Sequence, residues 1–204
     1  MPSSIRPSDA ARTRLSPEDR QQQLLRVASD IIASDGVDKV RIPHVAAIAG
    51  ITRPVVYKFF PNRHELIKGV LEDFREDFAR RAPNIMQSEA DADVASIARA
   101  FIDAACDTIE EKGPGGWQLL RSVGPDREIS AISREFRGQL VKPWLLPLRQ
   151  LTGVDDAEAQ ALADMMLSGA GEILQRWIDG DFSRQQVATL LGRIIFSVLS
   201  EFTE

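Results

Sequence analysis

The residues best suited to a chemical task in this chain lie in one short segment that begins at Arg53. The segment carries two cations, a methyl surface and a phenol hydroxyl: Arg53, Lys58, Val55 and Tyr57. Val56 and Phe60 are four residues apart and can pack inward from the same helix. Cationic and hydroxyl groups on an exposed face can contact DNA phosphates and base edges, and a methyl surface can contact thymine. The segment is therefore a candidate DNA-reading helix.

A second short helix would precede this one and hold it in place. Its apolar positions recur at helical spacing and stop at Gly50: Ile42, Val45, Ala46, Ile48 and Ala49. After the turn Gly50-Ile51-Thr52, Thr52 is a good N-cap for the helix from Arg53 to Phe60. Two short helices across such a turn predict a helix-turn-helix, whose second helix enters the major groove of DNA. The turn alone also occurs in all-α proteins that never touch DNA.

The longer run from Val45 to Leu66 resembles the DNA-binding domain of the tetracycline-repressor (TetR) family of bacterial regulators. The positions in register with the family pattern are Gly50, Tyr57, Phe59, Asn62, Arg63, Glu65 and Leu66. The resemblance in sequence extends from the helix at Ser16 to the helix after Asn62. Beyond that helix, only the expected helical architecture resembles the family. Two positions depart from the pattern. Arg41 stands where a Ser or Thr often caps the first helix of the motif, and Pro43 stands where a polar DNA contact is common.

The resemblance implies a sequence-specific transcriptional regulator, most simply a repressor that a small-molecule effector releases from double-stranded operator DNA. It also implies a homodimer that pairs through its last two helices. The candidate DNA contacts are Arg41, His44, Thr52, Arg53, Pro54, Val55, Tyr57, Lys58 and Arg63. The alternative is a stand-alone helical protein that binds a small molecule and has no DNA function. In that case the exposed donors of the candidate reading helix would have no role.

Catalytic function finds little support in the sequence. The chain has two histidines, His44 and His64, both in the DNA-reading half, and one cysteine, Cys106. No His or Cys cluster has metal-ligand spacing, and the LSGAG segment around Ser168 is not a nucleophile elbow. We therefore expect a protein that is not an enzyme and that needs no metal or cofactor.

Composition indicates a globular protein whose charge is unevenly distributed. Hydrophobic residues make up 44% and charged residues 27% of the 204 residues, and the net charge is −5. Residues 1–68 hold 11 Lys and Arg against 7 Asp and Glu, whereas residues 69–204 hold 14 against 23. This asymmetry suits a DNA-facing end attached to an acidic body.

The single cysteine fits a reducing cytoplasm. No apolar stretch approaches the ~20 residues that span a bilayer, and the first residues have no apolar core of the kind found in secretory signals. We therefore expect a cytoplasmic protein without a membrane partner.

Apolar periodicity along the whole chain predicts an all-α fold of about nine helices. We expect a disordered basic arm over residues 1–15, a three-helix DNA-binding domain over 16–61, and a helical effector-binding and dimerisation domain over 62–204. The first helix should be capped by Ser16 and end at Gly36, and the helix that begins at Asn62 should stop at Pro83. Further helices are expected over residues 90–112, 117–123, 127–151 and 155–179, and from Ser183 onward. Pro143 and Pro147 should kink or break the helix over 127–151 near residue 142.

The last two helices carry more apolar surface than one packed side needs. Residues 168–171 (Ser-Gly-Ala-Gly) would allow close helix approach, and the final helix is apolar over more than half of its circumference. The candidate dimer interface is Gly169, Ile173, Leu191, Ile194, Ile195 and Val198. Burial of these helices inside the monomer is the alternative.

The body is also where a regulator of this kind would bind its effector. The candidate wall residues are Phe101, Trp117, Leu120, Trp144, Met165, Met166 and Trp177. Each of them alone is more often a core residue than a pocket residue. An aromatic, apolar wall would favour an aromatic or lipophilic ligand.

Overall fold

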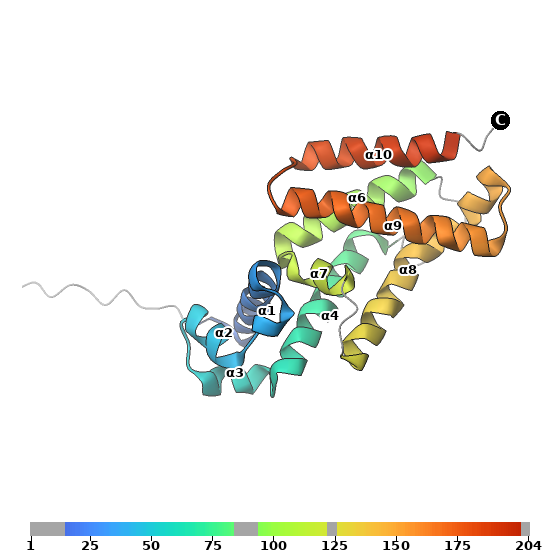
Figure 1. Ribbon diagram of the computed structural model, residues 1–204. Helices are drawn as coiled ribbons and strands as arrows, with labels where there is room; N and C mark the ends of the chain where they lie inside the picture. Colours follow the sequence, from blue (N-terminus) through green and yellow to red (C-terminus); the bar gives the residue numbers. More distant parts are fainter. Residues whose placement is uncertain (1–14, 84–93, 122–125, 201–204) are drawn as a thin grey trace, which may run out of the picture.

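The computed structural model describes residues 15–83, 94–121 and 126–200, and every regular element in that part of the chain is helical (Figure 1). The elements in order are α1 (Pro17–Asp35), the 3-10 turn η1 (Val37–Lys39), α2 (Ile42–Ile48), α3 (Arg53–Phe59), α4 (Arg63–Arg81), α6 (Val94–Lys112), α7 (Gly115–Arg121), α8 (Arg127–Thr152), α9 (Asp156–Ile178) and α10 (Arg184–Ser200). The expected all-α class is confirmed. Almost all of the expected N-terminal arm lies outside the described residues.

Local capping signals set several helix ends where the sequence predicts them. The Ser16 hydroxyl accepts the N–H of Asp19 at 3.0 Å, and the Asn62 side chain accepts the N–H of Glu65 at 2.9 Å. At the start of α10, the N–H of Ser183 donates to the side chain of Gln186 at 2.8 Å. Each bond satisfies an N–H group that has no partner inside its helix or turn.

Of the kink or break expected near residue 142, the break is wrong, because α8 continues as one helix to Thr152 with both Pro143 and Pro147 inside it. A proline in a helix interior removes one hydrogen bond and costs about 3 kcal/mol or more. Pro143 and the following Trp144 are buried, as is Leu148 one turn later. Burial of this apolar face between neighbouring helices offsets the cost of the two prolines.

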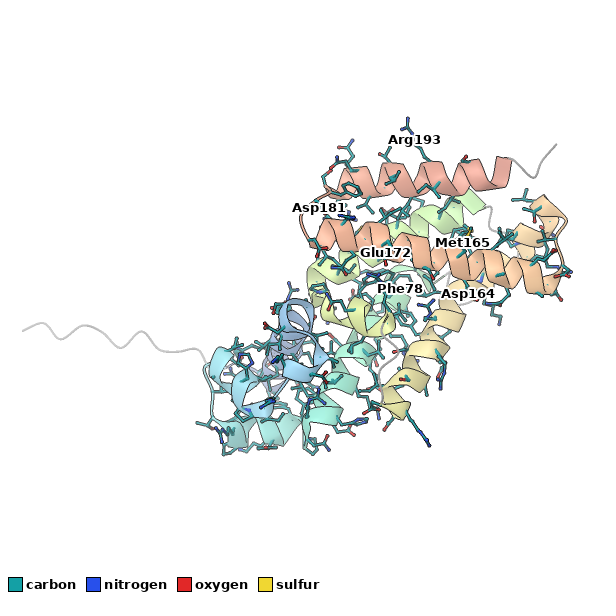
Figure 2. The ribbon with its side chains drawn as sticks, viewed as in Figure 1. Phe78, Asp164, Met165, Glu172, Asp181 and Arg193 are labelled. Carbon is teal, nitrogen blue, oxygen red and sulfur yellow. The ribbon has the colours of Figure 1, made fainter. Side chains whose placement is uncertain are left out.

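Helix α4 connects the N-terminal helices α1–α3, the reading end, to helices α6–α10, the body (Figure 1). Helices α1, α2 and α3 lie together at one end, α4 runs from there into the body, and α9 and α10 lie on the far side of it. Five aromatic side chains from α4, α6, α7 and α8 form the centre of the body, and one of them, Phe78, is labelled in Figure 2. The ring centroid of Phe78 lies 5.7 Å from that of Phe136 and 5.9 Å from that of Phe101. These helices therefore meet in one continuous core.

Helix α7 packs closely against both α1 and α4 because it begins with two glycines. The N–H of Gly115 donates to the buried hydroxyl of Ser29 on α1 at 2.9 Å. A Cβ atom on Gly115 would overlap the backbone of Ser29, and one on Gly116 would overlap the Cβ and ring of Phe74. The backbone of α7 thus approaches its neighbours at distances that a side chain would prevent.

No helix in the described residues is long and apolar enough to cross a membrane.

Candidate nucleic-acid interface

Helices α2 and α3 form the two-helix unit that the sequence predicts. Gly50 adopts φ 66°, which favours glycine, and the N–H of Ile51 donates to the carbonyl of Ala46 at 3.0 Å. Val45 and Val56 are fully buried between the helices and α1. The inner face of α3 is thereby fixed, and its other face points to solvent.

The outer face of this unit carries polar groups without internal partners. The candidate contacts that are solvent-exposed are Arg41, His44, Thr52, Arg53, Pro54, Tyr57 and Lys58, and Val55 is half-buried. Among the residues that the structure describes, none of the polar side chains in that set has a hydrogen-bond or ion-pair partner. Thr52 occupies the N-cap position of α3 but makes no side-chain capping bond, so its hydroxyl is also unengaged. Such donors are available to phosphates and base edges.

Ile48 does not lie on the buried stripe of α2, as the sequence pattern had placed it. Its side chain is 54% exposed, whereas Ile42, Val45 and Ala46 are buried. At about 100° per residue, position 48 falls outside the arc that contains the buried positions. An apolar side chain therefore stands on the surface next to the turn.

Arg63 has a structural role that the sequence did not reveal. Its Nε donates to the carbonyl of Val40 at 2.8 Å, and one terminal nitrogen donates to the carbonyl of Val37 at 2.6 Å. These bonds hold the 3-10 turn against the start of α4. Contact between Arg63 and DNA stays a prediction.

His64 ties the start of α4 to the start of α8. Its Nδ1 lies 2.7 Å from a carboxylate oxygen of Asp126, its Nε2 lies 2.9 Å from one of Glu128, and Lys68 lies 2.8 Å from the other oxygen of Glu128. Both ring nitrogens must donate to satisfy two carboxylates, which requires the imidazolium form. The hydrogen bond to Asp126 raises the pKa of His64 most, and that to Glu128 raises it further, against an opposing effect of burial.

This cluster makes stability depend on pH in one direction. The pKa of His64 is raised in the folded state, so its contribution is complete below the unfolded value of 6.5 and is lost as pH rises through the folded value. We expect the stability advantage of the wild type over His64→Gln to be largest below pH 6.5 and to shrink as the pH rises above that value. Urea unfolding at each pH measures it. His44→Gln, which removes an exposed ring without a described partner, should leave the profile unchanged. Parallel profiles for wild type and His64→Gln would contradict the prediction.

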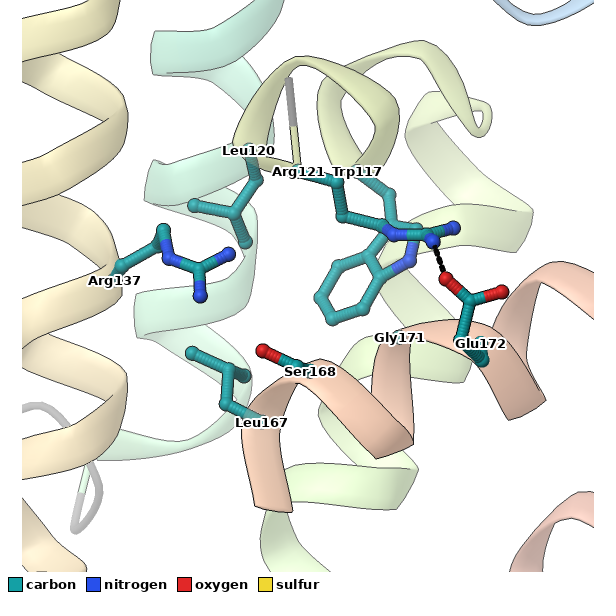
Figure 3. Close-up of a pocket in the computed structure, with 8 residues that line it drawn as sticks. All are labelled: Trp117, Leu120, Arg121, Arg137, Leu167, Ser168, Gly171 and Glu172. Atoms are coloured by element: carbon teal, nitrogen blue, oxygen red, sulfur yellow. Dashed lines mark hydrogen bonds and ion pairs between the residues drawn. The ribbon is translucent and has the colours of Figure 1, made fainter. Parts of the chain in front are cut away.

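In the described part of the chain, only two of the seven candidate effector residues line the cavity between α7, α8 and α9, and the effector site stays a prediction. Trp117 and Leu120 line a cavity of about 200 Å³, together with Arg121, Arg137, Leu167, Ser168, Gly171 and Glu172 (Figure 3). Phe101 and Trp144 are buried core residues instead, Met165 is 54% exposed, and Met166 and Trp177 are half-buried. The cavity also contains two arginines, which an apolar pattern cannot reveal.

Two candidate dimer residues are buried inside the monomer, which corrects the sequence-based interface. Leu191 is 2% exposed and Ile195 is also buried, because that face of α10 packs against α6. A side chain already buried in its own chain cannot be the centre of a contact with a second copy. Ile194 is 42% exposed and Gly169 is exposed. Ile173 is half-buried, and the side chain of Val198 lies outside the described residues.

Comparison with known proteins agrees with this geometry. The family model described as bacterial regulatory proteins, tetR family, matches residues 24–70, which extend from α1 into α4. A solved tetR-family regulator from Streptomyces coelicolor is 26% identical, covers 89% of this chain and 80% of its own, and superposes with a TM-score of 0.60. Residues 24–70 therefore match the tetR-family model, and the fold of the whole chain is similar to that of a solved tetR-family regulator. The structural similarity extends beyond residues 24–70, because the solved regulator covers 89% of this chain.

Two curated relatives of this chain are named as transcriptional regulators. The regulator LuxR of Vibrio harveyi is 32% identical over 45% of this chain, and this chain spans less than half of its length, 46%. A transcriptional repressor of Mycobacterium tuberculosis is 24% identical over 74% of this chain and 87% of its own length.

Proposed function

We propose that this protein is a homodimeric transcriptional repressor that a small-molecule effector releases from its operator. In this proposal residues 16–61 read double-stranded DNA, and residues 62–204 bind the effector and form the dimer. The observation that carries it is the outer face of α2 and α3, whose polar side chains have no partner in the described part of the chain. A mycobacterial relative named as a repressor supports a role in transcriptional repression.

The proposed mechanism rests on spacing between two copies of α3. A dimer would present them to successive major grooves about 34–36 Å apart. Helix α4 connects each reading end to its body, so a rotation of α4 would change that spacing. An effector can favour the released state only if it binds that state more tightly than the DNA-bound state.

Retention of genomic DNA tests the proposed function directly. The purified full chain is mixed with fragmented genomic DNA, and the retained fragments are sequenced. We expect a small set of enriched sites, each with two related half-sites. Recovery of no enriched sequence would overturn the proposal and favour a helical ligand-binding protein without DNA function.

Replacement of Arg53 and of Lys58 by alanine should change DNA binding in different ways. Arg53 is the first residue of α3, where a recognition helix comes closest to base edges, and a bidentate contact with guanine is worth about 1–3 kcal/mol of discrimination. Arg53→Ala should therefore relax the preference at one position of each half-site. Lys58 lies in the last turn, so Lys58→Ala should weaken binding to all sequences alike and reduce the salt slope by about 1 for each copy.

Fluorescence anisotropy on cognate and scrambled duplexes at several salt concentrations separates the two effects. Lys142→Ala removes an exposed lysine of α8 and serves as the control for overall charge. Equal losses on cognate and scrambled DNA would make Arg53 a phosphate contact. An unchanged salt slope for Lys58→Ala would show that Lys58 does not contact a DNA phosphate.

A further inference from the structure

The cavity between α7, α8 and α9 combines an apolar wall with cationic side chains (Figure 3). The apolar wall is formed by Trp117, Leu120 and Leu167. The two cations differ in their surroundings, and that difference indicates what the cavity can bind.

Arg121 is already neutralised within the protein. Its guanidinium forms an ion pair with Glu172, drawn as a dashed line in Figure 3, and lies 3.3 Å from the side-chain oxygen of Gln175. Gly171 leaves room for this arrangement, because a Cβ atom there would lie 3.2 Å from Nε of Arg121. Arg121 therefore forms part of the wall and has little capacity left for an anion.

Arg137 is half-buried on α8 and has no hydrogen-bond or ion-pair partner within the described ranges of the chain. Figure 3 shows its guanidinium directed into the space between Leu120 and Ser168. A cation withdrawn from water without a counter-charge is unfavourable, and a planar carboxylate can pair with a guanidinium through two parallel hydrogen bonds. The unpaired cation thus favours an anionic ligand.

A second polar group in the wall is also unsatisfied. The side chain of Trp117 is 1% exposed, and its Nε1 has no acceptor among the described residues. Buried indole N–H groups usually find a hydrogen-bond partner. The Ser168 hydroxyl, in contrast, donates to the carbonyl of Asp164 at 2.8 Å, so it offers only an acceptor to the cavity. Figure 3 shows the indole nitrogen of Trp117 on the side of Arg121 and Glu172, so the cavity presents one unused donor group, the guanidinium of Arg137, and one unused acceptor, the hydroxyl oxygen of Ser168.

We propose that this cavity binds a compact organic carboxylate, with Arg137 pairing with the carboxylate and Trp117, Leu120 and Leu167 enclosing an apolar body. A volume of about 200 Å³ suits a single ring or a short alkyl chain, since a cavity of about 150 Å³ can hold benzene. The role of this ligand as effector rests on the proposed function, whereas its binding does not. The ligand class is narrower than the aromatic or lipophilic molecule that the sequence favours.

Matched acids and amides test the ligand class on the wild-type full chain without DNA. The probes are benzoate, phenylacetate and hexanoate, each paired with its neutral amide, and calorimetry measures binding. We expect at least one acid to bind about tenfold more tightly than its amide, because a charge-assisted pair is roughly twice as strong as a neutral one. Failure of all three acids to bind, or equal binding of acid and amide, would overturn the proposal.

A pair of arginine variants tests the residue assignment. Arg137→Gln should weaken binding of the preferred acid by about tenfold, and Arg134→Gln should not, because Arg134 is exposed one turn earlier on α8. Unchanged binding in Arg137→Gln would overturn the role of Arg137. If Arg137→Gln does not fold, the comparison of acids and amides on the wild type still decides the ligand class.

Genomic retention without ligand keeps the two proposals separate. If no acid binds but genomic fragments are retained, the proposed carboxylate site is wrong and the proposed repressor function still stands. If an acid binds but no genomic fragment is retained, the carboxylate site is supported and the proposed repressor function is wrong.

Discussion

Gly116→Ala should lower the free energy of unfolding by about 3 kcal/mol, close to 10 °C in Tm for a chain of this size. The added Cβ would overlap the Cβ and ring of Phe74. Phe74 is 1% exposed within the aromatic centre, so neither it nor α7 can move without displacing other buried rings. Thermal unfolding followed by circular dichroism measures the change.

Gly138→Ala provides the matched control for this substitution. Gly138 lies within α8, is exposed, and has no neighbour within 4 Å of a built Cβ. Alanine is favoured over glycine by about 1 kcal/mol at such a helical site, so this variant should be slightly more stable than the wild type. A Tm for Gly116→Ala equal to that of the wild type would show that α7 is not packed as the structure describes.

Ile194→Glu should convert the proposed dimer to monomers and weaken operator binding by about 10²–10⁴-fold through loss of bivalency. The outward faces of α9 and α10 expose Met165, Leu190 and Ile194, while Leu191 faces the monomer core. Figure 2 shows Arg193, the neighbour of Ile194, projecting from α10 away from α9. Two glutamates facing each other across a symmetric contact would repel and lose hydration.

Sedimentation at micromolar concentration distinguishes the outcomes for Ile194→Glu. Leu15→Glu is the control, because Leu15 is 41% exposed just before α1, far in sequence from α9 and α10, and its replacement should leave the association state unchanged. A folded dimer of Ile194→Glu would place the contact elsewhere. Leu191→Glu is not a test of the dimer, since it buries a charge inside the monomer and should unfold α10.

Local signals explain why much of the fold could be predicted from the sequence. Capping residues such as Ser16 and Asn62 accept hydrogen bonds from N–H groups three residues away, so the helix ends that they set can be predicted from a short stretch of sequence. The helix-turn-helix is equally local, because Gly50 and the apolar positions around it lie within one short segment. The continuity of α8 across Pro143 was not predictable in this way, because it depends on packing against distant helices.

The remaining differences between the sequence-based predictions and the structure concern which face of a helix is buried and which contacts form between distant helices. Helix α10 is apolar over so much of its circumference that periodicity could not show whether Leu191 or Ile194 faces inward, and the position of α6 decides it. Arg137 and His64 look like ordinary surface residues in the sequence. Their surroundings arise only when α8 meets α7 and α9, or when α4 meets α8.

The glycine contacts of α7 affect how motion can pass through this molecule. Helix α7 contributes Trp117 and Leu120 to the cavity, and its first residue, Gly115, lies against Ser29 on α1. At that end main chain meets main chain, so no side chain can change rotamer and absorb a small displacement. The joint is therefore mechanically stiff. A shift of α7 by a fraction of an ångström toward α1 would be passed on to the helix that supports α2 and α3.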